Sequence, residues 1–141
     1  MSLTVFVTGA TAGFGHAIAT RLVQDGHRVI ATGRRLDRLE ALRHELGENL
    51  LPFQLDMRDR TAIRALPANL PEDWKTVDVL INNAGLALGV DAAQNSDPGD
   101  WETMISTNVS GVVEITRALL PLMVERNSGY VISLGSTAGT Y

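Results

Sequence analysis

Short apolar segments alternate along the chain with longer segments whose apolar residues recur every three or four positions. The short segments predict five buried strands, at residues 3–7, 29–31, 50–55, 77–81 and 130–134. The longer segments predict helices at residues 17–23, 36–46, 59–66 and 101–123, the last preceded by a polar loop at residues 91–99. Gly26 and Gly47 end the first two helices, and Pro67 and Pro71 mark a loop after the third. A bend or break is expected in the fourth, which contains Gly111 and Pro121.

The regular alternation of strands and helices with short connections defines the expected fold class. It predicts an α/β protein with a doubly wound parallel sheet and helices on both faces. Right-handed crossovers limit the topology, and we expect the strand order 3-2-1-4-5. In such a sheet a ligand binds at the carboxyl edge, near the first and fourth strands. The 141 residues suit a single domain, residues 1–141.

Composition excludes several kinds of function. The chain is 45% hydrophobic and 20% charged, as is ordinary for a soluble globular protein. Its net charge of −4 offers no electrostatic basis for binding nucleic acid or an acidic membrane. There is no cysteine, and the three histidines stand at unrelated spacings, so we expect no metal site. No apolar run approaches the roughly 20 residues of a membrane span, and a cytoplasmic location is the expectation.

A glycine-rich segment at residues 8–15 follows the first predicted strand and opens the first predicted helix. In this context Gly9 permits a tight turn, Gly13 lets the backbone approach a pyrophosphate, and Gly15 lets the helix pack closely. The free N–H groups at the start of the helix then hold the phosphates. A P-loop would need Lys and Ser or Thr after its last glycine, but His16 and Ala17 stand there.

Two arginines follow the second strand, where NAD-binding proteins carry an acidic residue that holds the ribose hydroxyls. The segment reads Thr32-Gly33-Arg34-Arg35, without a carboxylate to repel a 2′-phosphate. Guanidinium groups suit bidentate phosphate binding, so NADP is favoured over NAD. The plainer alternative is that both arginines are surface charges at a helix start, although the helix dipole disfavours cations there. A methyltransferase that binds S-adenosylmethionine would also need an acidic residue after the second strand, so this alternative is disfavoured by the same observation.

Polar residues also follow the third and fourth strands. Asp56 could hold the adenine amino group or cap the following turn, and the two roles are compatible. Asn82-Asn83-Ala84-Gly85 comes after the fourth strand. Its asparagines can tie neighbouring strands together, and small Ala84 and Gly85 would let a cofactor pass close to the backbone.

The pattern T-G-x-x-x-G-x-G, followed at this separation by N-N-A-G, resembles the short-chain dehydrogenase/reductase family, with its Rossmann-type fold. The resemblance assigns Asn108 and Ser136, the latter in Gly135-Ser136-Thr137-Ala138-Gly139, as catalytic residues. Asn108 would shape the site and relay a proton through water, and the Ser136 hydroxyl would hold the substrate oxygen as charge shifts onto it. The plainer roles are an amide on a helix face and a capping serine. The implied cofactor contacts are Gly9, Thr11, Gly13, Phe14, Gly15, Arg34, Arg35, Asp56, Asn82, Ala84 and Gly85.

Further segments narrow the resemblance to bacterial NADP-dependent 3-hydroxy acid dehydrogenases, which act on serine, allo-threonine and related small molecules. These segments are residues 32–35, 85–89 and 100–104. The expected reaction passes a hydride between NADP and a hydroxyl or carbonyl substrate. A homo-oligomer, dimer or tetramer, is also expected. A non-catalytic dinucleotide-binding module, or a ketoreductase for another substrate, remains the alternative.

The family's acid–base motif, Tyr-x-x-x-Lys, does not occur in residues 1–141, and Tyr141 stands too close to Ser136 to serve as its tyrosine. The chain is therefore expected either to be a fragment, truncated after the fifth strand, or to be a shortened relative. In both cases we expect residues 1–141 alone to catalyse no turnover. We also expect the outer edge of the fifth strand to be unpaired and prone to association.

Overall fold

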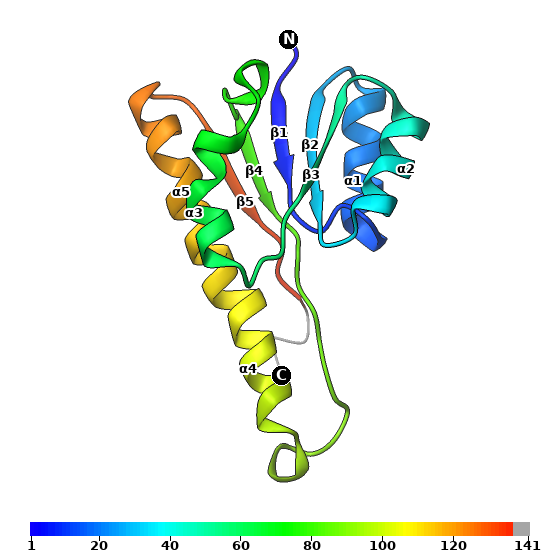
Figure 1. Cartoon of the computed structure of the whole chain (residues 1–141), viewed down its shortest axis with the longest axis vertical. Coiled ribbons are helices and arrows are strands. Elements are labelled where there is room, and N and C mark those ends of the chain that lie inside the picture. Colours follow the sequence, from blue (N-terminus) through cyan, green and yellow to red (C-terminus); the bar gives the residue numbers. More distant parts are fainter. Residues whose placement is uncertain (137–141) are drawn as a thin grey trace.

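The computed structural model describes residues 1–136 and contains one parallel five-stranded sheet, shown in Figure 1. Its strands are β1 (Thr4–Val7), β2 (Arg28–Gly33), β3 (Leu50–Gln54), β4 (Val79–Asn82) and β5 (Tyr130–Ser133). The order across the sheet is β3-β2-β1-β4-β5, and every neighbouring pair is parallel. The predicted fold class and strand order are confirmed. The order reverses between β1 and β4, and this reversal positions the site at their carboxyl ends.

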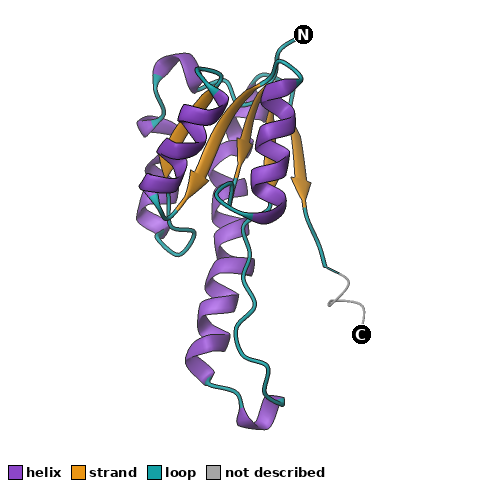
Figure 2. Ribbon diagram, turned by 90° about the vertical axis from the view of Figure 1, so that its right-hand side faces the viewer, coloured by secondary structure: helices purple, strands orange, loops and turns teal. Residues whose placement is uncertain are grey.

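Helices cover both faces of the sheet because successive strand residues point to opposite sides. Helices α1 (Gly13–Gln24) and α2 (Leu36–Leu46) pack on one face, against Val5, Val7 and Val29 among others. Helices α3 (Arg60–Asn69) and α5 (Gly111–Glu125) pack on the other, where Phe6 and Leu80 belong to the second core cluster. Figure 2, a view turned by 90°, shows the helices on the two sides of the strands.

Helix ends follow local sequence signals in three places. Gly26 and Gly47 have φ angles of +87° and +85° just after α1 and α2, where glycine is the residue that adopts such angles without strain. The Asp59 side chain accepts a hydrogen bond from the Ala62 N–H and caps α3. Pro67 was expected in the loop beyond α3, and this expectation is wrong. It lies inside the helix, which continues to Asn69 and closes with a bond from the Leu70 N–H to the Leu66 carbonyl.

The fourth predicted helix is longer and more continuous than its sequence suggests. Helix α4 (Pro98–Ile105) runs through a π-helical segment, Ser106–Ser110, directly into α5. Pro98 occupies the first helical turn, where its missing N–H costs no hydrogen bond, so the helix begins within the predicted loop. That loop also contains a short 3₁₀ helix, Ala93–Asn95. Of the expected bend or break, a break does not occur at Pro121, because α5 continues through it to Glu125.

Strand β5 differs from the others in its surroundings. All four of its residues are exposed, whereas β1 and β4 are buried along their whole length. It pairs with β4 alone and forms the edge of the sheet, as expected. A second 3₁₀ helix, Glu72–Trp74, precedes β4. Within residues 1–136, no helix combines the length and the apolar character that crossing a membrane requires.

Candidate functional site

The loop between β1 and α1 is built around glycines that no other residue could replace without movement. Gly9 and Gly13 have φ angles of +64° and +56°. A Cβ atom on Gly9 would lie 2.9 Å from the Ala84 Cα, and one on Gly15 would overlap both the Gly9 carbonyl and the Asn83 side-chain amide. Gly13 has open space around its missing Cβ and faces the cavity described below. The loop is therefore packed tightly on its inner side and open on its outer side.

Thr8 and Asn83 lock this loop to the end of β4. The buried Thr8 hydroxyl oxygen accepts hydrogen bonds from the N–H groups of Asn83 at 3.0 Å and Ala84 at 2.8 Å. In return the Asn83 side-chain amide donates to the carbonyls of Thr8 at 3.0 Å and Gly9 at 3.1 Å. These four bonds satisfy backbone groups that the ends of β1 and β4 leave without ladder partners. They hold the two loops in a single arrangement at the point where the strand order reverses.

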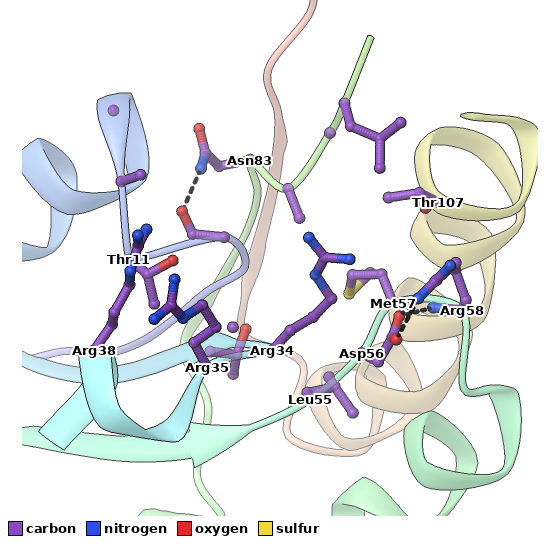
Figure 3. A pocket seen from close by; sticks show the side chains of 18 of the residues that line it. Thr11, Arg34, Arg35, Arg38, Leu55, Asp56, Met57, Arg58, Asn83 and Thr107 are labelled. Carbon is purple, nitrogen blue, oxygen red and sulfur yellow. Dashed lines mark hydrogen bonds and ion pairs between the residues drawn. The ribbon is translucent and has the colours of Figure 1, made fainter. Parts of the chain in front are cut away.

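A cavity of about 500 Å³ opens at this edge of the sheet, and Figure 3 shows it from close by. Its walls come from the segments that follow β1, β2, β3 and β4, together with the π-helical segment. The lining residues are Gly9, Thr11, Ala12, Gly13, Phe14, Thr32, Gly33, Arg34, Arg35, Arg38, Leu55, Asp56, Met57, Arg58, Asn83, Ala84, Gly85, Leu86 and Thr107. Nine of the predicted cofactor contacts are among them: Gly9, Thr11, Gly13, Phe14, Arg34, Arg35, Asp56, Ala84 and Gly85.

Two predicted contacts lie elsewhere. Gly15 is buried beneath the loop, where it permits the close packing expected of it. Asn82 is also buried, and its side-chain amide donates at 3.3 Å to both the Thr116 and the Ser133 hydroxyl. Asn82 therefore ties β4 to α5 and β5, which is the alternative that its amide chemistry offered.

Four guanidinium groups surround the cavity, against one carboxylate among its lining residues. Figure 3 shows Arg34, Arg35 and Arg38 on one side and Arg58 on the other. Arg35 pairs with Asp37 at 3.2 Å, and both side chains are more than half exposed. That contact lowers the pKa of the Asp37 carboxyl. The Arg34 guanidinium makes no hydrogen bond or ion pair with any residue in the described part of the chain.

Asp56, the single carboxylate among the lining residues, accepts hydrogen bonds from Arg58. The Arg58 guanidinium donates to it at 3.0 and 3.2 Å, and the Arg58 N–H donates at 2.9 Å. The side-chain hydrogen bond from Arg58 lowers the pKa of Asp56, and the more distant charge of Arg34 contributes in the same direction. The N–H bond is the turn-capping role considered for Asp56. One of its two proposed roles is thus present in the structure.

The start of α1 completes an anion-binding arrangement. No side chain caps this helix, and Ala12, Gly13 and Phe14 at its N-terminus line the cavity. The unpaired N–H groups and the positive end of the helix dipole favour a negatively charged group at that position. The open space at Gly13 and the surplus of positive charge from the arginines also favour a negatively charged group there. The residues present therefore fit a phosphate-bearing ligand.

Asn108 lies in the π-helical segment and forms hydrogen bonds to Leu86, in the loop that follows β4. Its side-chain amide donates to the Leu86 carbonyl at 2.7 Å, and its side-chain oxygen accepts from the Leu86 N–H at 2.9 Å. A π-helical segment inside an α-helix is often found at a functional site. Gly111, the first residue of α5, lets this region approach the third strand's exit, because a Cβ there would lie 2.6 Å from the Met57 carbonyl oxygen.

Ser136, the second predicted catalytic residue, is exposed and follows β5 by three residues, at the same edge of the sheet as Asn108. Leu134 continues the pairing, since its N–H donates to the Asn82 carbonyl at 3.0 Å. The rest of the Ser136 motif, residues 137–139, and Tyr141 lie outside the described residues. In the described part of the chain, no group of three or more potential metal-ligating side chains is present.

Several lining residues were not singled out from the sequence. Arg38 lies in the first turn of α2, close in sequence to Arg34 and Arg35, and this third nearby arginine was a usable signal. Nothing in the sequence around Arg58 indicated that it lines the cavity. Thr107 precedes Asn108, is 8% exposed, and its hydroxyl oxygen has no partner among the described residues. Asn83 stands in a motif that was recognised, but its role in holding the loop depends on β1 and β4 being adjacent.

Comparison with known proteins identifies the family of this chain. The short chain dehydrogenase family model matches residues 3–141. The chain belongs to the short chain dehydrogenase family, which the glycine-rich loop and the parallel sheet had indicated.

The relatives are similar over nearly all of this chain. An NADP-dependent 3-hydroxy acid dehydrogenase, YdfG, from Salmonella typhi is 59% identical over 99% of the chain and 56% of its own length. A serine 3-dehydrogenase from Rhizobium radiobacter is 47% identical over 100% of the chain and 56% of its own length. The closed form of a serine dehydrogenase complexed with NADP⁺ superposes with a TM-score of 0.96, at 57% identity, over 99% of this chain and 56% of that one. The chain thus spans little more than half the length of these relatives.

Proposed function

We propose that this protein binds NADP(H) in the cavity at the carboxyl ends of β1 and β4. The observation that carries the proposal is the surplus of guanidinium groups around the cavity, with Arg34 unpaired by any described residue. Arg34, Arg35 and Arg38 would hold the 2′-phosphate, since arginine presents donors in a fork that matches phosphate oxygens. The N-terminus of α1 would hold the pyrophosphate. Asp56 and the backbone near Ala84 would contact the adenosine part.

The absence of an acidic side chain at the end of β2 supports a preference for NADP(H), and local packing disfavours a larger residue there. At the end of β2 an acidic side chain would be needed for the free ribose hydroxyls, but Gly33 stands there. A Cβ atom on Gly33 would lie 2.8 Å from the Thr11 Cγ2 atom, so a larger residue requires Thr11 to move. Without a carboxylate at this position, nothing repels a 2′-phosphate. These features favour NADP(H) over NAD(H).

The reaction proposed is oxidation of the hydroxyl group of a short 3-hydroxy acid, such as serine or allo-threonine, and its reverse. NADP(H), when bound, supplies or accepts the hydride at its nicotinamide ring. The Ser136 hydroxyl would donate a hydrogen bond to the substrate oxygen where negative charge develops. Asn108 would hold the segment after β4 in place through Leu86. The substrate class is supported by the names of the relatives, and a cytoplasmic location, where NADP(H) is available, is part of the proposal.

Cofactor titrations test the binding proposal. The protein expressed from its complete coding sequence is titrated with NADPH and with NADH, following protein-to-nicotinamide energy transfer, at two salt concentrations. We expect NADPH to bind about 10 to 100 times more tightly, because charge-assisted bonds contribute roughly 1.5–3 kcal/mol. The preference should decrease as salt rises. Equal affinities at low salt would contradict the assignment of the arginines.

Substrate oxidation tests the reaction. NADP⁺ reduction at 340 nm is followed with L-serine, D-serine, L-allo-threonine and 3-hydroxybutyrate, and with a simple secondary alcohol as control. We expect turnover with the 3-hydroxy acids and a Ser136→Ala variant that binds NADPH normally but has lost most of its activity. Binding without turnover on any of these compounds would favour a non-catalytic dinucleotide-binding module.

A homo-oligomer is also part of the proposal, supported by an apolar stripe on the helix opposite the sheet. Exposed apolar side chains recur at intervals of four or seven residues along α4, the π-helical segment and α5. They are Trp101, Ile105, Val109, Val113, Leu120 and Val124. Exposed Arg117 interrupts the series between Val113 and Leu120. Exposed apolar side chains gathered in this way are typical of a surface that packs against another protein. Light scattering should give a dimer or tetramer, and Val113→Glu should shift it toward a monomer, whereas Glu125→Gln should not.

A further inference from the structure

We propose that Arg58 determines cofactor specificity indirectly, by occupying the Asp56 carboxylate and so leaving the Arg34 guanidinium available for the 2′-phosphate. This inference rests on the proposed function, because it concerns how the same cavity recognises NADP(H). It assigns to Arg58 the part of a positioning residue rather than that of a direct phosphate ligand.

The first step of the argument is the geometry of the pair. Asp56 receives two guanidinium hydrogen bonds and one N–H bond, all from Arg58. One oxygen accepts two of these bonds and the other accepts one. The N–H bond holds the carboxylate by a short turn, and the planar guanidinium then meets it side by side. Asp56 is therefore satisfied by a residue that comes from its own loop.

The second step is the position of Arg34. It lines the same cavity as Asp56, and its charge lowers the pKa of the Asp56 carboxyl, so the two groups interact electrostatically. In Figure 3 the Arg34 side chain lies between the Arg35 and Arg38 side chains and the Asp56–Arg58 pair. Arg34 is exposed, with a long side chain that can adopt several rotamers. No described residue pairs with its guanidinium group.

The third step is what removal of Arg58 would do. Asp56 would keep its negative charge at the edge of a basic cavity but lose its principal partner. Arg34 would then be the cation available to it, and a pair between them would compete directly with phosphate binding. An unpaired Asp56 would also repel the phosphate. In both cases NADP(H) would lose more affinity than NAD(H), which has no 2′-phosphate.

The test is a double-mutant cycle on Arg58 and Asp56, measured as the ratio of the NADH to the NADPH dissociation constant in the complete protein. Arg58→Gln should lower this ratio about tenfold. Asp56→Asn should leave the ratio close to that of the wild type, because any lost adenine contact weakens both cofactors equally. The double variant Asp56→Asn with Arg58→Gln should restore the ratio to within about threefold of the wild type. Arg60→Gln, an arginine outside the cavity lining, is the matched control.

Each outcome decides between explanations. A ratio that stays low in the double variant would show that Arg58 binds the phosphate directly and would overturn the positioning role. An unchanged ratio in Arg58→Gln would also overturn it. If the wild type binds both cofactors equally, the proposed NADP function and this inference fail together, whereas a wild-type preference that survives Arg58→Gln rejects the inference alone. Thermal unfolding of each ligand-free variant confirms that the affinities are measured on folded protein.

Discussion

Two regions of the molecule differ in how they are built. One is the cavity at the carboxyl ends of β1 to β4, and the other is the sheet edge formed by β5. Around the cavity, the strands are covered on both faces and the loops are locked by reciprocal hydrogen bonds between Thr8 and Asn83. At the other edge every residue of β5 is exposed, and Ser136 follows it in an exposed position. Within residues 1–136, the cavity is thus surrounded by tightly packed and hydrogen-bonded segments, whereas the β5 edge is exposed.

The difference fits the proposed binding of phosphates by the glycine loop. Backbone groups that bind phosphate must be held in accurate positions, and the loop is packed against neighbouring strands. Asn108, in the π-helical segment, fixes Leu86 on the cavity wall. Substitutions in the packed region should therefore affect folding and binding together, and those at the edge should affect neither strongly.

The largest effect is expected at Gly15. An alanine there places a methyl group on the Gly9 carbonyl and the Asn83 amide, so the loop has to move. We expect Gly15→Ala to lower the free energy of unfolding by about 3 kcal/mol and to weaken NADPH binding more than tenfold. Urea denaturation and cofactor titration measure the two quantities.

Gly135→Ala is the matched control from the other region. No atom of the described residues lies within 4 Å of the position that its methyl group would take, and its φ angle is not positive. Its unfolding free energy should therefore change by less than about 0.5 kcal/mol. Equal destabilisation by the two alanines would remove the contrast between the packed and the open region.

The next effect concerns Arg34. Loss of its guanidinium group should weaken NADPH binding by about one order of magnitude while NADH binding changes less than about threefold. Arg117→Ala removes the same charge from the exposed face of α5 and should leave both affinities unchanged. If Arg117→Ala reduced NADPH binding as much as Arg34→Ala, net charge rather than the cavity would explain the preference.

A smaller effect is expected at Asn108, which holds Leu86 on the cavity wall. Asn108→Ala removes both bonds to Leu86 and should lower the free energy of unfolding by about 1 kcal/mol. Amide hydrogen exchange at Leu86 should accelerate, while NADPH affinity stays within about threefold of the wild type. Val109→Ala, an exposed neighbour in the same segment, should leave exchange at Leu86 unchanged. Protection at Leu86 in the Asn108 variant would show that the segment is held by other contacts.

The smallest effect is the pH dependence of the Asp56–Arg58 pair. The hydrogen bond from Arg58 lowers the pKa of Asp56 from its ordinary value of 3.8. A lowered folded-state pKa stabilises the protein above the unfolded-state value, and this contribution is lost as pH falls below about 4. Both side chains are more than a third exposed, so solvent screening limits the contribution to well under about 1 kcal/mol.

Urea denaturation of ligand-free protein between pH 7 and pH 3 measures this dependence. The wild type should be slightly more stable than Arg58→Gln near neutral pH, and the difference should vanish at the acidic end. A difference that is constant with pH would mean that Arg58 acts through packing and not through the charge of Asp56.

Local sequence signals determined the elements and their order. The apolar segments identified all five strands, and the helix over residues 36–46 was predicted with its observed bounds, because Leu36 and Gly47 mark its ends clearly. The errors concern the prolines: Pro67 was expected beyond a helix end, and a bend or break was expected within the helix that contains Pro121, which continues without a break. Tertiary packing overrode the local preference there: Leu66, beside Pro67, and Leu119, two residues before Pro121, are both buried in the core.

The sequence by itself also predicted where the cavity lies, because glycines between a strand and a helix have a restricted set of uses. Only the tertiary structure decided which charges meet in the cavity. Arg34 and Asp56 stand 22 positions apart and share a wall because β2 pairs with β3, and Thr8 meets Asn83 because β1 pairs with β4. Backbone conformation depends mainly on residues that are close in the sequence, so it can be predicted from the sequence. Charged side chains interact through space, so their partners depend on which segments the fold places next to one another.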